Sequence, residues 1–291
     1  MAFQFILNGL IVGSLYALVA LGFSLIYHTT HVFHIAHGAI YTAGAYLLYL
    51  FYSLLGLPFF PSLALALLCT VGLGILVDRW VYAPVLKTRP NPLIAFISSL
   101  GVYIIVVNLI ALLFGNDTKI LMPSVEPTFS FASLIVTRVQ MVQLLISLLV
   151  IVGVFLLLWT SKLGYIIRGL ADNQELMSIL GLKVNTVRCA VVGLGSGLAG
   201  LAAILVALDV GIDPYVGMEI LLVAAVATII GGVGSYHGAT LGAVLLGIVQ
   251  NLVIWQTSAR WQSAVTFLIL LLVLLLKPQG LLSGKTRVEE I

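Results

Sequence analysis

The chain has 291 residues, of which 62% are hydrophobic and only 8% are charged, and its mean hydropathy is +1.21. A soluble domain carries about 25% charged residues, so this chain could not cover its surface in water and a soluble protein is excluded. The formal net charge of +3 shows no strong basic or acidic bias, and no nucleic-acid partner is expected.

The apolar runs predict membrane-spanning helices. At about 20 residues per span, the chain has room for eight to ten helices and almost no extramembrane domain. The runs are unbroken and rich in Leu, Ala and Gly, unlike the alternating strands of a membrane barrel. We therefore predict an all-α, polytopic helical bundle in which residues 1–291 form a single transmembrane domain. The predicted spans are residues 4–27, 36–56, 61–83, 92–114, 140–160, 189–209, 218–233, 238–256 and 261–277.

Nine crossings would place the N-terminus outside and the C-terminus inside, and the basic residues agree with this orientation. Three of them fall outside, namely Lys119, Arg138 and Arg260, and the other ten fall inside. The inner ones are Arg79, Lys87, Arg89, Lys162, Arg168, Lys183, Arg188, Lys277, Lys285 and Arg287. The loop 161–188 and the tail 278–291 are thus predicted to be cytoplasmic. The short segments around 28–37 and 231–238 could instead re-enter the membrane, which would change the span count.

Small residues in the spans predict close helix packing, because small-xxx-small faces allow backbones to approach within a membrane. Glycine pairs at a spacing of four occur at Gly9 and Gly13, Gly193 and Gly197, and Gly238 and Gly242. The two cysteines, Cys69 and Cys189, lie far apart in apolar runs and are expected to be free and buried.

Four histidines follow one another at steps of three residues: His28, His31, His34 and His37. A step of three turns an α-helix by about 300°, so these side chains would spread over half its circumference. No Cys, Asp or Glu lies nearby to complete a tetrahedral metal set, and no metal site is expected. We expect His37 to cap the second span or to line a pathway, with Gly38 allowing a tight entry. His28 and His31 are expected to face the cytoplasmic headgroups.

One long stretch between spans is not apolar: residues 161–188, "SKLGYIIRGLADNQELMSILGLKVNTVR". As a helix, residues 171–180 place Leu176, Ile179 and Leu180 along one side, and Gly181 stands where a glycine would end the helix. Two interpretations remain open from the residues alone. The segment is either a solvated connector on the membrane surface or a helix that docks into a groove on a cytosolic partner.

This loop resembles the cytoplasmic coupling loop of ABC importer permeases, and in particular that of the branched-chain amino acid permeases. Their pattern is R-A-x-A-x-(N/D)-x-x-x-A-x-x-x-G-I. Arg168, Ala171, Asn173 and Gly181 match it, with Leu182 for the Ile, whereas Gly169 and Met177 replace small alanines. Further segments similar to this family are 8–27, 36–47 with Ala-His-Gly, 231–250 with Gly-Gly-x-Gly-Ser, and 277–282.

The resemblance implies a permease subunit that moves branched-chain or other apolar amino acids across the cytoplasmic (inner) membrane of a bacterium or archaeon. Its implied partners are a second homologous permease, two cytosolic ABC ATPase subunits, an extracytoplasmic solute-binding protein and membrane lipid. ATP would be used by the partner subunits, with no cofactor bound by this chain. The residues implied to couple to the ATPases are Arg168, Ala171, Asp172, Asn173, Glu175, Gly181 and Leu182.

No enzyme activity is expected, because no paired carboxylates, Ser–His–Asp set or zinc-protease helix occurs, and no catalytic residue is assigned. The tail "GLLSGKT" is not a P-loop, since three residues rather than four separate Gly280 from Gly284. The chain is therefore expected to have no ATPase site of its own.

The transport pathway is less well marked than the coupling loop. Polar side chains within spans form hydrogen bonds between helices more often than they contact substrate. The pathway or structural candidates are Asn8, His37, Gly38, Tyr41, Gly231, Gly232, Gly234 and Gln250.

Two alternatives to an amino-acid importer remain. One is a permease for urea, short amides or another small neutral solute. The other is a self-sufficient channel or secondary transporter, which would usually carry ionisable residues inside the membrane. No acidic residue is expected in the middle of a span.

Overall fold

A computed structural model describes residues 2–88, 91–121, 127–131 and 134–282. The tail beyond residue 282, with Lys285 and Arg287, lies outside the described residues, as does Arg89. The helices are α1 (Ala2–Thr30), α2 (Ala36–Leu48), α3 (Phe59–Val77), α4 (Ala83–Thr88), α5 (Pro92–Phe114), α6 (Arg138–Thr160), α7 (Lys162–Asp172), α8 (Gln174–Ile179), α9 (Val184–Val210), α10 (Val216–Gly231), α11 (Tyr236–Gln256) and α12 (Gln262–Leu276). Two π-helical segments, η1 (Tyr49–Leu54) and η2 (Asp78–Tyr82), continue α2 and α3, and a 3₁₀ turn, η3 (Ala259–Trp261), precedes α12.

Each predicted span coincides with a helix, and the predicted all-α helical bundle is confirmed. Within the described residues, seven helices are long and apolar enough to cross a membrane, namely α1, α3, α5, α6, α9, α11 and α12 with their direct continuations. The other two predicted spans correspond to α2 with η1 and to the 16-residue α10, which are not among these seven. The only strands described are β1 (Thr128–Phe131) and β2 (Leu134–Thr137), which form an antiparallel hairpin before α6.

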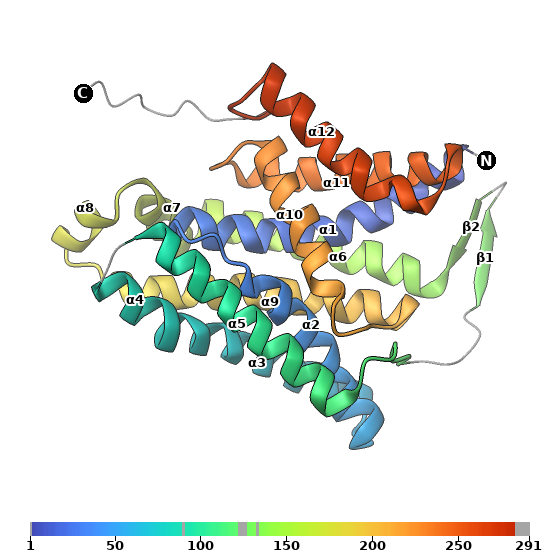
Figure 1. Ribbon diagram of the computed structural model, residues 1–291, viewed down its shortest axis with the longest axis horizontal. Helices are drawn as coiled ribbons and strands as arrows, with labels where there is room; N and C mark the ends of the chain where they lie inside the picture. Colours follow the sequence, from blue (N-terminus) through green and yellow to red (C-terminus); the bar gives the residue numbers. More distant parts are fainter. Residues whose placement is uncertain (1, 89–90, 122–126, 132–133, 283–291) are drawn as a thin grey trace.

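The connecting segments gather at two opposite ends of the bundle (Figure 1). The hairpin and the N-terminus lie at one end, where the Gln4 side chain donates to the Ile135 carbonyl. We call the opposite end, formed by residues 31–35, 161–183, 232–235 and 278–282, the inner end. Its parts are tied together: Gln174 donates to the Thr29 carbonyl, and the Leu281 amide donates to the Ile230 carbonyl. All segments predicted to be cytoplasmic and described here thus lie at one end.

The two segments that could have re-entered the membrane are short turns. Residues 31–35 connect α1 to α2, and residues 232–235 connect α10 to α11. Buried side chains concentrate in α1, α2, α9 and α10, whereas α3, α5, α6 and above all α12 leave most of their apolar surface uncovered. The centre of the bundle is therefore formed by α1, α2, α9 and α10, and the outer helices present faces suited to lipid or to a partner chain.

Glycine allows α1 to cross α11 at very short range. A Cβ atom added at Gly9 would lie 2.6 Å from the Ile248 Cα, and one at Gly13 would lie 2.9 Å from the Val244 Cα. Such distances leave no room for a side chain, so the small-residue spacing of the first span serves helix packing.

The two cysteines, Cys69 and Cys189, are free as predicted. Cys69 is exposed on α3 and Cys189 is half-buried, so the expected burial was wrong.

We expect Gly13→Val to lower the free energy of unfolding by about 1–3 kcal/mol, because the added methyl groups force α1 away from α11. Thermal unfolding in detergent measures the change. Gly72→Val is the matched control, since no described atom beyond the backbone of its own helix lies within 4 Å of a Cβ built there. Equal melting temperatures for the two variants would contradict the close crossing.

Candidate functional site

The loop predicted to couple this chain to a motor folds as two consecutive helices, α7 and α8, which we call the coupling segment (Lys162–Ile179). The Ser161 side chain caps α7 by accepting from the Gly164 amide at 3.0 Å. The Asn173 side chain caps α8 by accepting from the Leu176 amide at 2.8 Å. The expected continuous helix over 171–180 was wrong, because the chain breaks at Asn173. An Asn before an acidic first turn is a common N-cap and could have indicated the break.

Gly181 ends α8 as predicted, with a φ of +81° that L-residues other than glycine rarely adopt. The Gly181 amide donates to the Ser178 carbonyl and the Leu182 amide donates to the Met177 carbonyl. This pair of bonds is a Schellman motif, which satisfies the last carbonyls of a helix. The chain therefore turns sharply from α8 into α9 through a hydrogen-bonded corner.

The two departures from the family pattern compensate for each other. Gly169 lies on α7 and Met177 on α8, and a Cβ atom added at Gly169 would lie 2.7 Å from the Met177 Cε. The long Met177 side chain therefore fills the space that the missing Gly169 side chain leaves. The packing of α7 against α8 is close even though neither residue is the usual alanine.

The outer surface of α8 is apolar and uncovered in this chain. Leu176, Ile179 and Leu180 are each more than half exposed at the tip of the inner end, and Glu175 beside them is also exposed. α8 projects from the bundle in Figure 1. Three neighbouring apolar side chains on a short projecting helix fit the helix-in-groove mode of binding better than a solvated connector.

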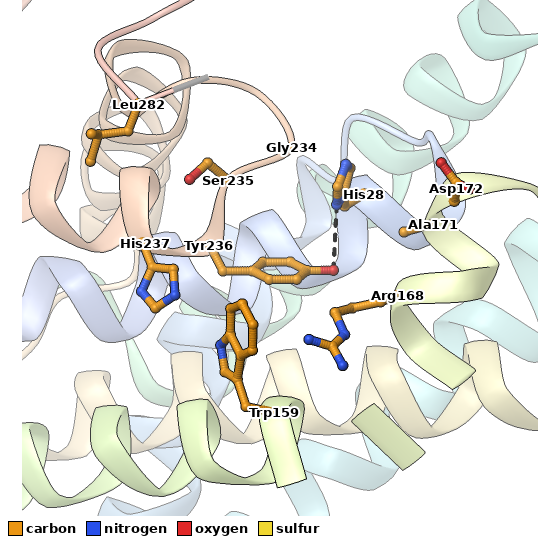
Figure 2. A pocket seen from close by; sticks show the side chains of 10 residues that line it. All are labelled: His28, Trp159, Arg168, Ala171, Asp172, Gly234, Ser235, Tyr236, His237 and Leu282. Carbon is orange, nitrogen blue, oxygen red and sulfur yellow. Dashed lines mark hydrogen bonds between the residues drawn. The ribbon is translucent and has the colours of Figure 1, made fainter. Parts of the chain in front are cut away.

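A pocket of about 360 Å³ lies between the coupling segment and the start of α11 (Figure 2). The Arg168 guanidinium lies 4.8 Å from the ring centres of both Trp159 and Tyr165, so aromatic faces hold it in place. Across the pocket, His28 Nδ1 lies 3.4 Å from the Tyr236 hydroxyl. The lining residues are His28, Trp159, Arg168, Ala171, Asp172, Gly234, Ser235, Tyr236, His237 and Leu282.

The pocket brings four of the predicted site residues together: Arg168, Ala171 and Asp172 from α7, and Gly234 from the glycine-rich turn. The other coupling candidates, Asn173, Glu175, Gly181 and Leu182, lie in α8 or at its ends and do not line it. α7 thus meets α1 and α11 at one place, and a displacement of α7 would act on both helices.

The glycine-rich turn and the C-terminal residues pack against each other. A Cβ atom added at Gly231 would lie 2.0 Å from the Gly238 carbonyl oxygen, so α10 and α11 cross in contact there. Gly232 and Gly234 have φ angles of +107° and +97°. The Leu282 amide donates to the Gly231 carbonyl at 3.0 Å. These glycines have a structural role at the inner end, and their part in a pathway stays a prediction.

The other pathway candidates lie within the bundle. Gln250 donates to the Thr266 hydroxyl of α12 at 2.7 Å, a bond between helices. Asn8 accepts from Gln4 at 3.0 Å within α1. Tyr41 is buried, and its hydroxyl has no partner among the described residues. Gly38 allows a close approach as expected, because a Cβ atom there would lie 2.6 Å from the Gly217 carbonyl oxygen of α10.

The histidines do not form one row. His31 is exposed and His28 lines the pocket, while His34 and His37 are fully buried with ring centres 5.6 Å apart. The expected cap at His37 was wrong: α2 has Ile35 as its N-cap residue, and no side chain caps it. His37 Nε2 instead contacts the Val19 carbonyl oxygen at 3.3 Å. No group of three or more His, Cys, Asp or Glu side chains that could hold a metal occurs in the described part of the chain.

His34, in the turn between α1 and α2, should make stability depend on pH. Burial, and secondarily the neighbouring His37, holds the pKa of His34 well below its ordinary value of 6.5. The unfolded chain therefore binds more protons than the folded one below pH 6.5, and stability is lost as the pH falls. We expect the melting temperature of His34→Asn to change less between pH 7 and pH 5 than that of the natural chain. His31→Asn, at an exposed site, should keep the natural dependence, and equal slopes for both variants would contradict the assignment.

The sequence analysis missed a buried ion pair. The Arg188 Nε atom of α9 lies 2.9 Å from the Asp78 Oδ1 atom, and the Asp78 side chain is fully buried. Asp78 is the first residue of η2, within the predicted span 61–83 but near its inner end. A single acid in an otherwise apolar run, "GLGILVDRW", was the available signal, because an ionisable residue in a span usually has a partner.

These features define a multi-pass membrane protein with a projecting segment at one end, the architecture of a transport permease. Its fold is similar to a chain of "PsaBC from Streptococcus pneumoniae in complex with Fab", with a TM-score of 0.55 and 13% identity over 95% of this chain and 93% of that one. Residues 5–274 match the family described as the permease component of the branched-chain amino acid transport system. The chain belongs to this family, and the predicted fold class of an ABC importer permease is confirmed.

Two relatives match over nearly their whole length. The high-affinity branched-chain amino acid transport system permease protein BraD of Pseudomonas aeruginosa is 30% identical over 99% of this chain and 97% of its own length. The corresponding permease protein LivH of Salmonella typhimurium is 29% identical over the same shares. The role of this chain is therefore that of a permease component of a transport system.

Proposed function

We propose that this permease moves branched-chain or other apolar amino acids inward across a bacterial or archaeal cytoplasmic membrane, driven by two separate ABC ATPase subunits. The family match over most of the chain supports the substrate class. The observation that carries the coupling is the uncovered apolar tip of α8, Leu176, Ile179 and Leu180, beside the exposed Glu175. A groove on an ATPase subunit would cover this tip, and this chain would itself bind neither ATP nor another cofactor.

The coupling step follows from the contacts of the segment. Closure of the ATPase subunits on ATP would push α8, whose corner at Gly181 passes the motion to α9. α7 would move with α8, because Met177 packs on Gly169, and Arg168 would act on the pocket between α1 and α11. Helices α9, α1 and α11 are then displaced together, and the bundle opens toward an extracytoplasmic binding protein that delivers the solute.

A second, homologous permease subunit would cover the outer face of α5. Asn108 is exposed there, and the only hydrogen bond described for its side chain is to the Ile104 carbonyl of its own helix. If Asn108 faced lipid, the remaining hydrogen-bonding groups of its side-chain amide would lack partners, and each unsatisfied polar group costs several kcal/mol. Gly101, seven residues earlier on the same face, has no atom within 4 Å of a built Cβ. We place the solute pathway between the α5 helices of two permease subunits.

Pairing can be tested by cysteine cross-linking of the assembled complex in membranes. Asn108→Cys should cross-link to the second permease, whereas Leu275→Cys, on the uncovered face of α12, should not. Cross-linking only from α12 would place the pairing surface elsewhere.

The substrate is tested on the cognate binding protein and then on the complex. Leucine, isoleucine and valine should raise the melting temperature of the binding protein and should be taken up with ATP in proteoliposomes. A shift with urea or short amides, and none with these amino acids, would favour the alternative of a small neutral solute. Uptake by this chain alone would instead indicate a self-sufficient channel or secondary transporter.

A further inference from the structure

The buried ion pair joins α3 to α9 at the inner end. Asp78 begins η2 directly after α3, and its two carboxylate oxygens lie 2.9 and 3.2 Å from the Arg188 Nε atom. Both side chains are nearly or fully removed from solvent. A buried ion pair is a poor source of stability, because desolvation offsets most of the attraction. Two apolar side chains would fill this space as well as the ion pair does. The presence of two buried charges therefore indicates a role other than stability.

Arg188 lies close to the coupling segment along the chain. α8 ends at Ile179 and α9 begins at Val184, and the corner between them is held by backbone hydrogen bonds. Arg188 is therefore about one helical turn into α9. Any displacement of α8 reaches Arg188 after a short, stiff connection.

The other end of η2 is bonded to a different part of the bundle. The Tyr82 hydroxyl contacts His34 Nδ1 at 2.5 Å and donates to the Ser99 hydroxyl of α5 at 2.8 Å. Ser99 in turn accepts from the Ala36 amide at the start of α2 at 2.9 Å. The five residues of η2 are thus bonded to α9 through Asp78 and to α5 and α2 through Tyr82. π-helical turns of this kind occur frequently at functional sites.

The side chains beside the Asp78–Arg188 pair are loosely packed, so this polar contact is important for joining α9 to η2. A cleft of about 430 Å³ opens there, lined by Arg79 and Ala83 on one side and by Asn185, Thr186 and Arg188 on the other. Side chains of α9 and of the η2–α4 stretch do not fill this space. Beside this open space, the start of α9 is joined to η2 by the Asp78–Arg188 pair and by the Cys189 thiol, which donates to Asp78 Oδ2 at 3.4 Å.

We propose that the Asp78–Arg188 pair is a positioning joint that carries the motion of the coupling segment through η2 and Tyr82 to Ser99, and so to α5. The inference rests on the proposed function, because α5 is the helix assigned to the pathway. The proposal adds residues outside the coupling segment (Lys162–Ile179) whose loss uncouples ATP hydrolysis from transport.

The experiment uses the complete complex of both permeases, the ATPase subunits and the binding protein in proteoliposomes, and measures solute moved per ATP hydrolysed. One variant is the double substitution Asp78→Leu/Arg188→Met, which keeps the site filled without a charge. The other is Tyr82→Phe, which removes only the hydroxyl. Each should lower the ratio of transport to hydrolysis by about tenfold, with the KM for the loaded binding protein unchanged. Thr228→Val is the control, because the one partner described for this buried hydroxyl is the Ala224 carbonyl of its own helix.

A structural role alone would leave the ratio unchanged in correctly assembled complexes, and a natural ratio in both variants would overturn the proposal. If the double variant does not assemble, Asp78→Asn/Arg188→Gln replaces it, because it also removes both charges, and a natural ratio there and in Tyr82→Phe has the same meaning. Failure of the proposed function would give a different result from failure of the proposed joint, because the natural complex would then show no ATP-driven uptake at all.

Discussion

Replacing residues 171–181 with a Gly/Ser linker of equal length is expected to reduce ATP-driven uptake to background while the chain still inserts into the membrane. The linker removes Leu176, Ile179 and Leu180, the apolar surface assigned to the ATPase groove. It also removes the Asn173 cap and the Gly181 corner that hold α8 in a defined orientation. Membrane insertion depends on the spans, none of which is changed. Uptake and solute-stimulated ATP hydrolysis in proteoliposomes, with the amount of chain in the membrane fraction, measure the effect.

A smaller change locates the effect on the tip of α8. Ile179→Ser/Leu180→Ser should weaken co-purification of the ATPase subunits and lower uptake. Leu163→Ser is the matched control, since Leu163 is also exposed at the inner end but lies at the start of α7. Normal uptake by the linker variant would refute the coupling assignment.

Gly101→Trp is expected to stop uptake without unfolding the chain. Beyond the backbone of its own helix, no described atom lies within 4 Å of a Cβ at Gly101, so the bundle itself can accept a large side chain. In the assembled transporter the indole would occupy the space that we assign to the solute and to the α5 helix of the second subunit. Uptake should fall to background, while the melting temperature of the isolated chain stays close to the natural value.

Gly153→Trp provides the comparison for this prediction. Gly153 is an equally open glycine, but it lies on α6, away from the face that carries Asn108. Uptake by this variant should remain near the natural level. If Gly101→Trp transports normally, or if both variants fail equally, the pathway does not run along α5.

The coupling segment shows both how far local sequence reasoning reaches and where it stops. Gly181 was predicted to end the helix, and it does so because a positive φ is a local property of the chain. The break at Asn173 was missed, although its cap is also local, because the apolar positions of 171–180 fit one continuous helix. The match between Gly169 and Met177 could not be foreseen, since it depends on α7 folding back against α8.

The partners of the histidines and of the ion pair could not be predicted, because these contacts join segments that are distant in the sequence. His34 contacts Tyr82, 48 residues away, and Arg188 binds Asp78, 110 residues away. No spacing within either segment indicates its partner. Asn108 and Gln250 are both polar residues within predicted spans, yet Gln250 bonds to another helix while Asn108 is left on an outer face.

By itself the sequence determined that this chain lies in a membrane, where its helices run and where its polar loop lies, because hydropathy and backbone geometry act over a few turns of one helix. Only the tertiary structure decided which polar groups meet, which glycines sit at crossings and which apolar faces stay uncovered. In an apolar bundle, many helix arrangements bury similar hydrophobic surface. Close contact between particular small and polar residues selects one of them.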